Sequence, residues 1–194
     1  MTKFDSFNEL AENWDQIYPR DLNKIRTMLD LLYIKNGDNV LDAGCGTGIL
    51  IPFLLEKTDG EKITAVDGAE KMIQKAKQKF PDKGIRFIAS DVTEYNFAPA
   101  SFNHIICYSV FPHIEDKKSA AKHFSRLLAE GGLLSILHSD SKEKINHIHS
   151  ESDEVNSENL KSPAGYIPLF NMEGLHEEIV IDNSEMYMLC VRKQ

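Results

Sequence analysis

Apolar segments typical of strands alternate with amphipathic segments typical of helices through the first two thirds of this 194-residue chain. Hydrophobic periodicity predicts helices at residues 21–34, 48–57, 69–80 and 116–132. Between and after them it predicts short strands at residues 39–44, 62–68, 84–92, 102–111 and 133–139. Strands that are apolar on both faces and alternate with helices indicate parallel strands covered on both sides. We therefore expect an α/β fold with a doubly wound, mostly parallel sheet.

The two ends of the chain and the region after the fifth strand add further elements to this sheet. Residues 177–193 read as two strands around Asn183-Ser184, which predicts a hairpin that gives the sheet an antiparallel C-terminal edge. Residues 139–169 are polar and irregular, and we expect an insertion there over the active site. It would begin with a helix, with Asp140 as N-cap and Glu143 as its capping-box partner. We expect one domain over residues 1–194, with residues 1–20 as a lid-like segment.

A glycine-rich turn follows the first predicted strand in the stretch VLDAGCGTGIL, residues 40–50. Ligands of open α/β sheets bind at the carboxyl ends of the strands, and glycines let the backbone approach them closely. The dinucleotide pattern GxGxxG would need a third glycine where this chain has Ile49. Asp42, two residues before the first glycine, would face a pyrophosphate unfavourably and suits a ligand with an amino group. Asp67 ends the second strand, where an acid can bind both hydroxyls of a ribose.

These elements resemble the class I S-adenosylmethionine-dependent methyltransferases, which have a Rossmann-like fold. The resemblance covers the turn 42–48, the acid at Asp67, the stretch 66–77, the segment 89–92, the strand end 106–116 and the glycine-containing element 127–136. It implies that Asp91 binds the adenine amino group, although a lone Asp at a strand end is also a common helix cap. Gly68-Ala69 departs slightly from the pairs often seen in the family. The cofactor contacts expected are Tyr18, Asp42, Gly44, Cys45, Gly46, Asp67, Gly68, Met72, Asp91, Val92 and Tyr108, with N–H groups of the glycine turn available for the carboxylate of the cofactor.

The amino-terminal stretch AENWDQIYPRD is similar to the entry of the ubiquinone- and menaquinone-methyltransferase-like branch of this family. In that branch the tyrosine closes over the cofactor, and the resemblance gives this role to Tyr18. Trp14 fits equally well as an apolar anchor of the same segment.

Three histidines are candidates for the catalytic side of the site. The resemblance places His113 near the transferred methyl group, although it also fits as a residue that begins a helix beside Pro112. His138 ends the fifth strand, and His149 lies on the helix predicted after it, whereas His147 should face away. His113, His138 and His149 are therefore expected to contact the substrate or to act as a base. A purely structural role and a metal site stay open, since their spacing alone does not define a metal site.

Composition and one missing motif limit the class of methyl acceptor that we expect. The net charge of −8 disfavours a sequence-independent nucleic-acid surface, and Cys107-Tyr108-Ser109-Val110 lacks the Asn/Asp-Pro-Pro-Tyr/Phe stretch of amino-methylating nucleic-acid enzymes of this fold. We therefore expect in-line methyl transfer to a small molecule. The alternatives are a methyltransferase of protein or nucleic acid and a non-catalytic S-adenosylmethionine-binding protein. Three scattered cysteines and the absence of a leader or membrane-span pattern favour the cytoplasm, whereas oligomeric state and the nucleophile stay open.

Overall fold

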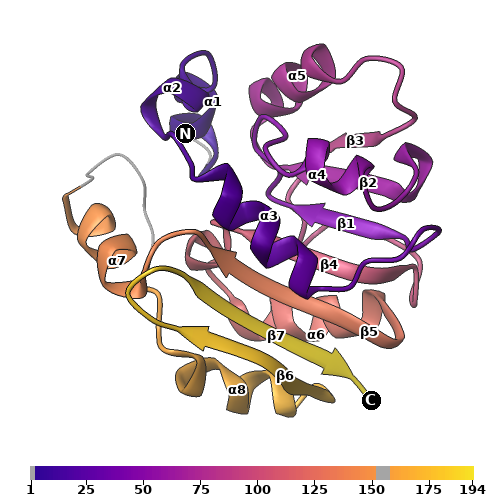
Figure 1. The fold of residues 1–194 in the computed structure, drawn as a ribbon, viewed down its shortest axis with the longest axis vertical. Helices are drawn as coiled ribbons and strands as arrows, with labels where there is room; N and C mark the ends of the chain where they lie inside the picture. The colour runs from indigo at the N-terminus through magenta and orange to yellow at the C-terminus, as the bar shows by residue number, and fades with distance from the viewer. Residues whose placement is uncertain (1–2, 152–157) are drawn as a thin grey trace. The chain divides into compact units, whose positions relative to one another are not determined.

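The computed structural model describes residues 3–151 and 158–194. The chain divides into two compact units, Met1–Tyr95 and Asn96–Gln194. Each unit holds parallel strands and the helices that pack on them (Figure 1). The expectation of one domain over the whole chain stays a prediction.

Three parallel strands form the frame of the first unit (Figure 1, violet to magenta). They are β1 (Val40–Ala43), β2 (Ile63–Asp67) and β3 (Arg86–Ala89), and β2 lies between the other two. Asp42 stands opposite Ala65, and Asp67 stands opposite Ala89. The carboxyl ends of these strands therefore meet at one edge, and the turns that follow them lie together there.

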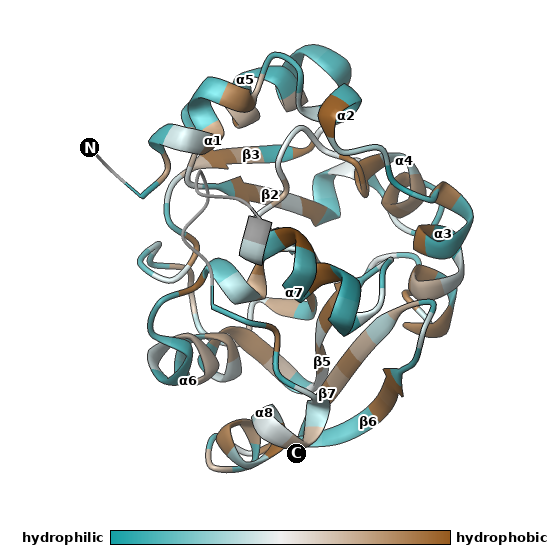
Figure 2. Ribbon diagram, turned by 90° about the vertical axis from the view of Figure 1, so that its left-hand side faces the viewer, coloured by the Kyte–Doolittle hydropathy of each residue, from teal (hydrophilic) through white to brown (hydrophobic). Residues whose placement is uncertain are grey.

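The helices of the first unit are short, at most 10 residues each. They are α1 (Asp5–Leu10), α2 (Trp14–Ile17), α3 (Leu22–Leu31), α4 (Ile51–Leu55) and α5 (Glu70–Lys79), with a 3₁₀ turn η1 (Gly60–Lys62) before β2. Asp21 caps α3 by accepting from the N–H groups of Asn23 and Lys24. Pro52 lies in the first turn of α4, where its missing N–H costs nothing, as the sequence predicted. α5 packs on β2 and β3 and alternates hydrophilic and hydrophobic residues (Figure 2).

The second unit has four strands in the order β4-β5-β7-β6. β4 (Phe102–Tyr108) and β5 (Leu128–His138) are parallel, whereas β7 (Tyr187–Lys193) runs antiparallel to both β5 and β6 (Leu175–Asp182). The predicted antiparallel hairpin is confirmed. Its helical elements are the 3₁₀ turn η2 (Phe111–His113), α6 (Lys117–Leu127), α7 (Lys142–Glu151) and α8 (Pro163–Asn171).

The boundary between α6 and β5 differs from the prediction. The helix was expected to run to residue 132 and stop at two glycines, but it ends at Leu127 and the strand begins at once. Leu128 pairs with Phe102, and the register then shifts before the next pair. Gly131 has a φ of +70°, so it marks an irregularity within the strand and not a helix stop.

Two features of the region 139–169 also differ from the prediction. Ser141 caps α7, since its Oγ accepts from the N–H of Lys144 at 3.2 Å, whereas Asp140 forms an ion pair with Lys144. α8 was not predicted, because Pro163, Gly165 and Pro168 read as loop residues. Pro163 is tolerated in the first turn, and burial of Tyr166 and Phe170 against Phe111 stabilises the helix despite Pro168.

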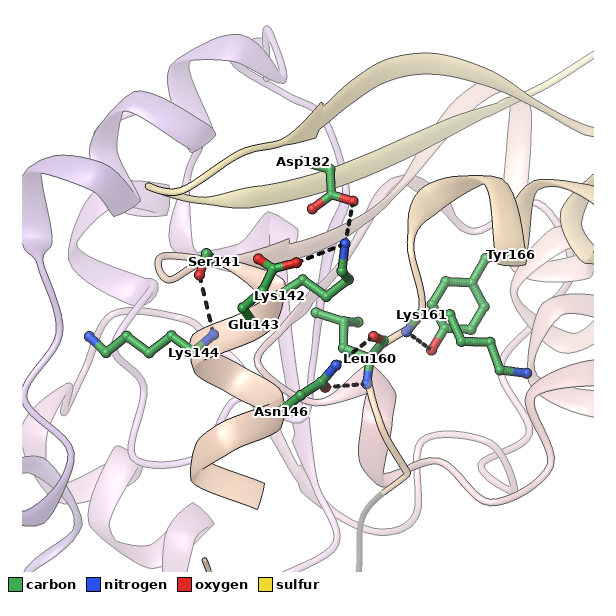
Figure 3. A network of polar contacts seen from close by, with 9 residues as sticks. All are labelled: Ser141, Lys142, Glu143, Lys144, Asn146, Leu160, Lys161, Tyr166 and Asp182. Carbon is green, nitrogen blue, oxygen red and sulfur yellow. Dashed lines mark hydrogen bonds and ion pairs between the residues drawn. The ribbon is translucent and has the colours of Figure 1, made fainter. Parts of the chain in front are cut away.

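A polar network fixes α7 within the second unit (Figure 3). Lys142 forms an ion pair with Asp182 of β6 at 3.0 Å. The amide of Asn146 makes two hydrogen bonds to the backbone of Leu160, at 3.0 and 2.7 Å. The helix that carries His149 is therefore held at both its first turn and its middle.

Among the helices of residues 3–151 and 158–194, none is both long and apolar enough to cross a bilayer.

Candidate functional site

Asp42, at the end of β1, is the most unusual carboxyl group in the first unit. It is 1% exposed, and its Oδ2 has no hydrogen-bond partner among the described residues. Burial and the charge of Asp67 raise the pKa of Asp42 to about 8. A buried acceptor without a donor costs about 1–3 kcal/mol, so this position is suited to a ligand that brings a donor or a positive charge.

The glycine turn after Asp42 requires its glycines. Gly44, Gly46 and Gly48 have φ values of +72°, +53° and +90°, which residues with a Cβ rarely adopt. The N–H groups of Gly44 and Cys45 donate to the carbonyl of Val66, at 2.8 and 2.9 Å. The turn is thereby tied to the end of β2. Cys45 itself is a buried free thiol whose pKa is raised by burial and by the two nearby carboxyl groups.

Asp67 joins the turns that follow β1 and β2. Its Oδ2 accepts from the N–H of Gly46 and its Oδ1 from the N–H of Ala69, each at 2.8 Å. Burial raises the pKa of Asp67 to about 6, although these two hydrogen bonds oppose the rise. The N–H groups of Gly44, Cys45 and Gly46 are thus engaged within the protein, which leaves less of the turn for a ligand carboxylate than the sequence suggested.

The side chain of Asp91 is engaged on both oxygens. Oδ1 accepts from the N–H and the hydroxyl of Thr93, at 2.8 and 2.7 Å. Oδ2 forms an ion pair with Lys3 at 2.5 Å. Burial raises the pKa of this carboxyl, but the hydrogen bonds from Lys3 and Thr93 outweigh burial and hold the pKa below its usual value. The sequence allowed a helix cap at Asp91, whereas the structure shows its carboxyl in a turn with Thr93, and binding of an adenine amino group stays a prediction.

Apolar residues next to Asp67 form a small cluster under the amino-terminal segment. Met72 is 1% exposed and packs with Ala11 and Ala69, and this cluster is covered by the rings of Phe4, Phe7 and Trp14. Val92 is also buried. The ring of Phe4 fills the space where a Cβ on Gly68 would stand. Sequence reasoning missed Lys3 and Phe4, because two residues ahead of the first helix carry no periodic signal.

Trp14 lies at the glycine turn, and Tyr18 packs against Trp14. The two rings pack with centroids 4.7 Å apart, and the indole nitrogen lies 3.6 Å from where a Cβ on Gly46 would stand. Trp14 therefore acts as the apolar anchor of the segment, while Tyr18 also carries the guanidinium of Arg20 over its ring at 5.5 Å. Closure of Tyr18 over a cofactor stays a prediction.

Polar contacts clamp the amino-terminal segment to the first unit. The hydroxyl of Thr47, in the glycine turn, donates to Asp15 at 2.6 Å and accepts from Lys79 at 2.9 Å. Lys79 also forms an ion pair with Asp15. The segment expected to be a lid is thus joined to the turn and to α5 by one shared group of side chains.

The second unit brings two of the three candidate histidines together. His113, at the end of η2, and His149, on α7, have ring centroids 5.3 Å apart. Burial lowers the pKa of His149, although a hydrogen bond to the backbone of Glu158 opposes this, and its Nδ1 has no hydrogen-bond partner among the described residues. His147 is exposed, as predicted. These two rings can therefore act on one ligand.

His138 lies in a different setting. It is 1% exposed, and its ring stands edge-on to that of Tyr187, with centroids 5.9 Å apart. Sequence reasoning missed Tyr187, a fully buried residue opposite His138 in the β5–β7 ladder. Tyr108, expected to line the cofactor, is buried and its hydroxyl is 2.8 Å from that of Ser139. Within the part of the chain that the structure describes, no three His, Cys, Asp or Glu side chains are grouped to hold a metal ion.

Comparison with solved structures defines the class of fold. A structure of an S-adenosylmethionine-dependent methyltransferase from Thermotoga maritima matches with a TM-score of 0.77 at 15% identity, covering 100% of both chains. The expected doubly wound fold with an antiparallel C-terminal edge is confirmed.

Comparison of sequences relates the chain to methyltransferases. Residues 40–132 match the model of the methyltransferase domain. The chain is 28% identical over 132 residues to the malonyl-[acyl-carrier protein] O-methyltransferase of Acetivibrio thermocellus, covering 67% of this chain and 46% of that protein. It is 29% identical over 138 residues to the demethylmenaquinone methyltransferase of Thermus thermophilus, covering 68% of this chain and 63% of that protein. Residues 40–132 thus match a methyltransferase domain, and the chain is similar in sequence and in fold to S-adenosylmethionine-dependent methyltransferases, as the resemblance predicted. It spans about half to two thirds of the length of these curated relatives.

Proposed function

We propose that this chain binds S-adenosylmethionine in its first unit and transfers the methyl group to a small molecule. When bound, the cofactor supplies a methyl group on a positively charged sulfur, which is already a good leaving group. The protein then has to contribute mainly proximity and alignment.

The observation that carries the proposal is the unsatisfied, buried carboxyl of Asp42. Burial and the charge of Asp67 raise the pKa of this group to about 8, which keeps it largely protonated at neutral pH. A ligand amino group placed beside it supplies both the missing donor and a positive charge. The ionised form of Asp42 then becomes favourable, which is the chemistry expected for the methionine end of the cofactor.

Asp67 fits the ribose. Its carboxylate can accept about four hydrogen bonds. Two come from Gly46 and Ala69, which hold the group at the end of β2. The remaining capacity suits the two hydroxyls of a ribose, and the neighbouring apolar cluster around Met72 suits the nucleoside base.

We assign the acceptor side to His113 and His149. Burial lowers the pKa of His149, so its imidazole is neutral at pH 7 and can accept a proton from an acceptor that starts protonated. His138 and Tyr108 are proposed as supporting residues at the carboxyl ends of β5 and β4.

A small-molecule acceptor is supported by two features. One similar protein is named for methyl transfer to demethylmenaquinone, a small molecule, and neither it nor the relative named for malonyl-[acyl-carrier protein] is named for a nucleic acid. The net charge of −8 disfavours binding to a phosphate backbone. The three cysteines are free and buried, which supports the proposed cytoplasmic location.

The experiment is a labelling of fractionated cell extract. The protein is incubated with methyl-labelled S-adenosylmethionine and with separate small-molecule, protein and nucleic-acid fractions, and the fraction that gains label is measured. We expect label in the small-molecule fraction, and much less of it with Asp67→Ala at a cofactor concentration that does not saturate the variant. Label in the protein or nucleic-acid fraction would contradict the proposed acceptor class.

A further inference from the structure

Gly68 is a glycine that the backbone does not require. It follows Asp67 directly, and its φ is not in the left-handed region, unlike those of the three glycines in the turn after β1. The main chain at residue 68 would therefore accept any side chain without strain.

The reason for a glycine at this position is Phe4. A Cβ on residue 68 would lie 2.2, 2.3 and 2.5 Å from three ring carbons of Phe4, far closer than atoms can approach. The ring of Phe4 thus fills the space that a side chain at position 68 would take. Residues 4 and 68 are distant in sequence, but they share one volume at the end of β2.

This volume borders the proposed nucleoside subsite. Asp67 precedes Gly68, and Ala69 and Met72 follow it in the apolar cluster that Phe4 covers. An apolar side chain at position 68 would project beside the carboxylate that we assign to the ribose. In this chain the apolar surface at that point comes from the amino-terminal segment.

We propose that Phe4 is a cofactor-binding residue whose ring replaces the side chain that Gly68 lacks and forms the apolar face on which the adenine packs. This inference rests on the proposed binding of S-adenosylmethionine to the first unit. It makes the segment of residues 3–18 a part of the cofactor site itself.

Contacts on either side of Phe4 hold its ring in place. On one side, Lys3 forms an ion pair with Asp91, and its ammonium stands 5.2 Å from the centroid of the Phe4 ring. On the other side, the Oδ1 of Asn8 accepts from the N–H of Lys71 at 3.0 Å, which caps α5 where Ala69 provides no side-chain cap. The ring is therefore positioned before a ligand arrives, which limits the entropy lost on binding.

Further along α5, the same segment is clamped by two ion pairs. Glu12 pairs with Lys75, and Asp15 pairs with Lys79. Lys71, Lys75 and Lys79 are four residues apart, so these contacts run along one face of the helix. The amino-terminal segment thus contacts α5 along the length of the helix, and Phe4 lies at one end of this interface.

The rival explanation is that Phe4 stands in the place of the adenine and must leave before the cofactor binds. The two explanations predict opposite signs for removal of the ring. If the ring of Phe4 lines the adenine site, its removal weakens nucleoside binding. If the ring occupies the adenine site, its removal strengthens nucleoside binding.

The test is a calorimetric titration of S-adenosylhomocysteine and of 5′-methylthioadenosine, which has the nucleoside without the amino acid. The full chain is compared with Phe4→Ala, Gly68→Leu and the double variant, and circular dichroism confirms that each is folded. We expect Phe4→Ala to weaken both ligands about tenfold, ~1.4 kcal/mol. Gly68→Leu alone should also weaken them, because the new side chain displaces the ring.

The double variant distinguishes the two explanations. The leucine side chain introduced at position 68 can fill the volume that Phe4→Ala vacates. We therefore expect the double variant to bind both ligands with an affinity close to that of the unaltered chain. Phe7→Ala is the matched control, because Phe7 covers the same cluster but does not stand over Gly68. Tighter or unchanged binding by Phe4→Ala, or no recovery in the double variant, would overturn the inference. Failure of the unaltered chain to bind either ligand would instead refute the proposed function.

Discussion

The carboxyl groups of Asp42 and Asp67 end two adjacent strands, and the charge of Asp67 adds to burial in raising the pKa of Asp42 to about 8. Asp67 has two N–H donors, whereas one oxygen of Asp42 has no partner among the described residues. The site therefore holds a buried acceptor that no donor among the described residues satisfies. An unsatisfied buried carboxyl lowers the stability of the folded protein, and it is suited to binding a positively charged group.

Asp42→Asn should stabilise the ligand-free protein and weaken cofactor binding. The folded-state pKa of Asp42 lies above its unfolded value, so its contribution to stability is greatest below about pH 4 and is lost as the pH rises through 8. An amide has no such loss, so the gain from the substitution should grow between pH 6 and pH 8, reaching about 1–3 kcal/mol. Urea unfolding of both proteins at the two pH values measures it. Equal differences at both pH values would show that Asp42 does not titrate in this range.

Cofactor binding should expel protons at pH 7.5. A ligand amino group beside Asp42 favours the ionised carboxyl and lowers its pKa from about 8, so a group that is mostly protonated before binding gives up its proton. Titrations of S-adenosylhomocysteine in two buffers with different ionisation enthalpies measure the release. Asp42→Asn is the control and should release fewer protons. The same release in both proteins would assign it to another group.

Lys3→Ala should raise the affinity for 5′-methylthioadenosine relative to that for its inosine analogue if Asp91 receives the adenine amino group, since Lys3 now pairs with the oxygen that this group would use. A hydrogen bond to a carboxylate is worth about 1.5–3 kcal/mol, so the ratio of the two affinities should rise about tenfold or more. The inosine analogue has no amino group, and any loss from freeing the Phe4 ring affects both nucleosides and cancels in the ratio. An unchanged ratio would leave Asp91 as the turn cap that its contacts with Thr93 indicate.

Thr47→Ala should loosen the amino-terminal segment. The hydroxyl of Thr47 is buried and joins the glycine turn to Asp15 and Lys79. Without it, the ion pair between Asp15 and Lys79 remains. That pair is partly exposed and contributes about 0.2–1 kcal/mol at most. Tryptic cleavage after Arg20 should become faster, and cofactor should slow it again. Lys57→Ala, which breaks the ion pair with Asp30 elsewhere in the first unit, is the control and should not change this cleavage.

His149→Gln should leave cofactor affinity unchanged and lower turnover once an acceptor is identified. In the unaltered protein the neutral imidazole is the active form, and burial lowers its pKa from the ordinary value, so turnover should rise with pH on the acidic side of neutrality. The variant should lose this rise. His147→Gln is the matched control on the exposed face of α7. A pH profile that survives in His149→Gln would reduce the histidine pair to a structural role.

The sequence predicted the alternation of strands and helices and the antiparallel hairpin, because burial on both faces and a turn at Asn183-Ser184 leave direct patterns. It did not predict the end of α6, because Gly131 signals a helix stop and a strand irregularity equally well. It missed α8 because prolines and a glycine mask a helix that is stabilised by burial of Tyr166 and Phe170, contacts that no local pattern contains.

The sequence predicted the order of glycines and acidic residues in the candidate site. It did not predict the hydrogen bonds and ion pairs of each acidic side chain. The unsatisfied oxygen of Asp42, the ion pair of Asp91 with Lys3 and the ring of Phe4 over Gly68 all depend on tertiary contacts. One signal was present in the sequence: Gly68 departs from the family pattern. The meaning of that departure becomes visible only when the backbone at Gly68 is seen to need no glycine.

The most direct test of the central claim is a calorimetric titration of the unaltered chain with S-adenosylmethionine and S-adenosylhomocysteine, with NAD in parallel and Asp67→Ala as the comparison. The account predicts micromolar binding of both sulfur nucleosides and no binding of NAD. It also predicts an affinity loss in Asp67→Ala of about tenfold or more, since hydrogen bonds to a charged acceptor are removed. Binding of NAD in place of the sulfur nucleosides, or an unchanged affinity in Asp67→Ala, would contradict it.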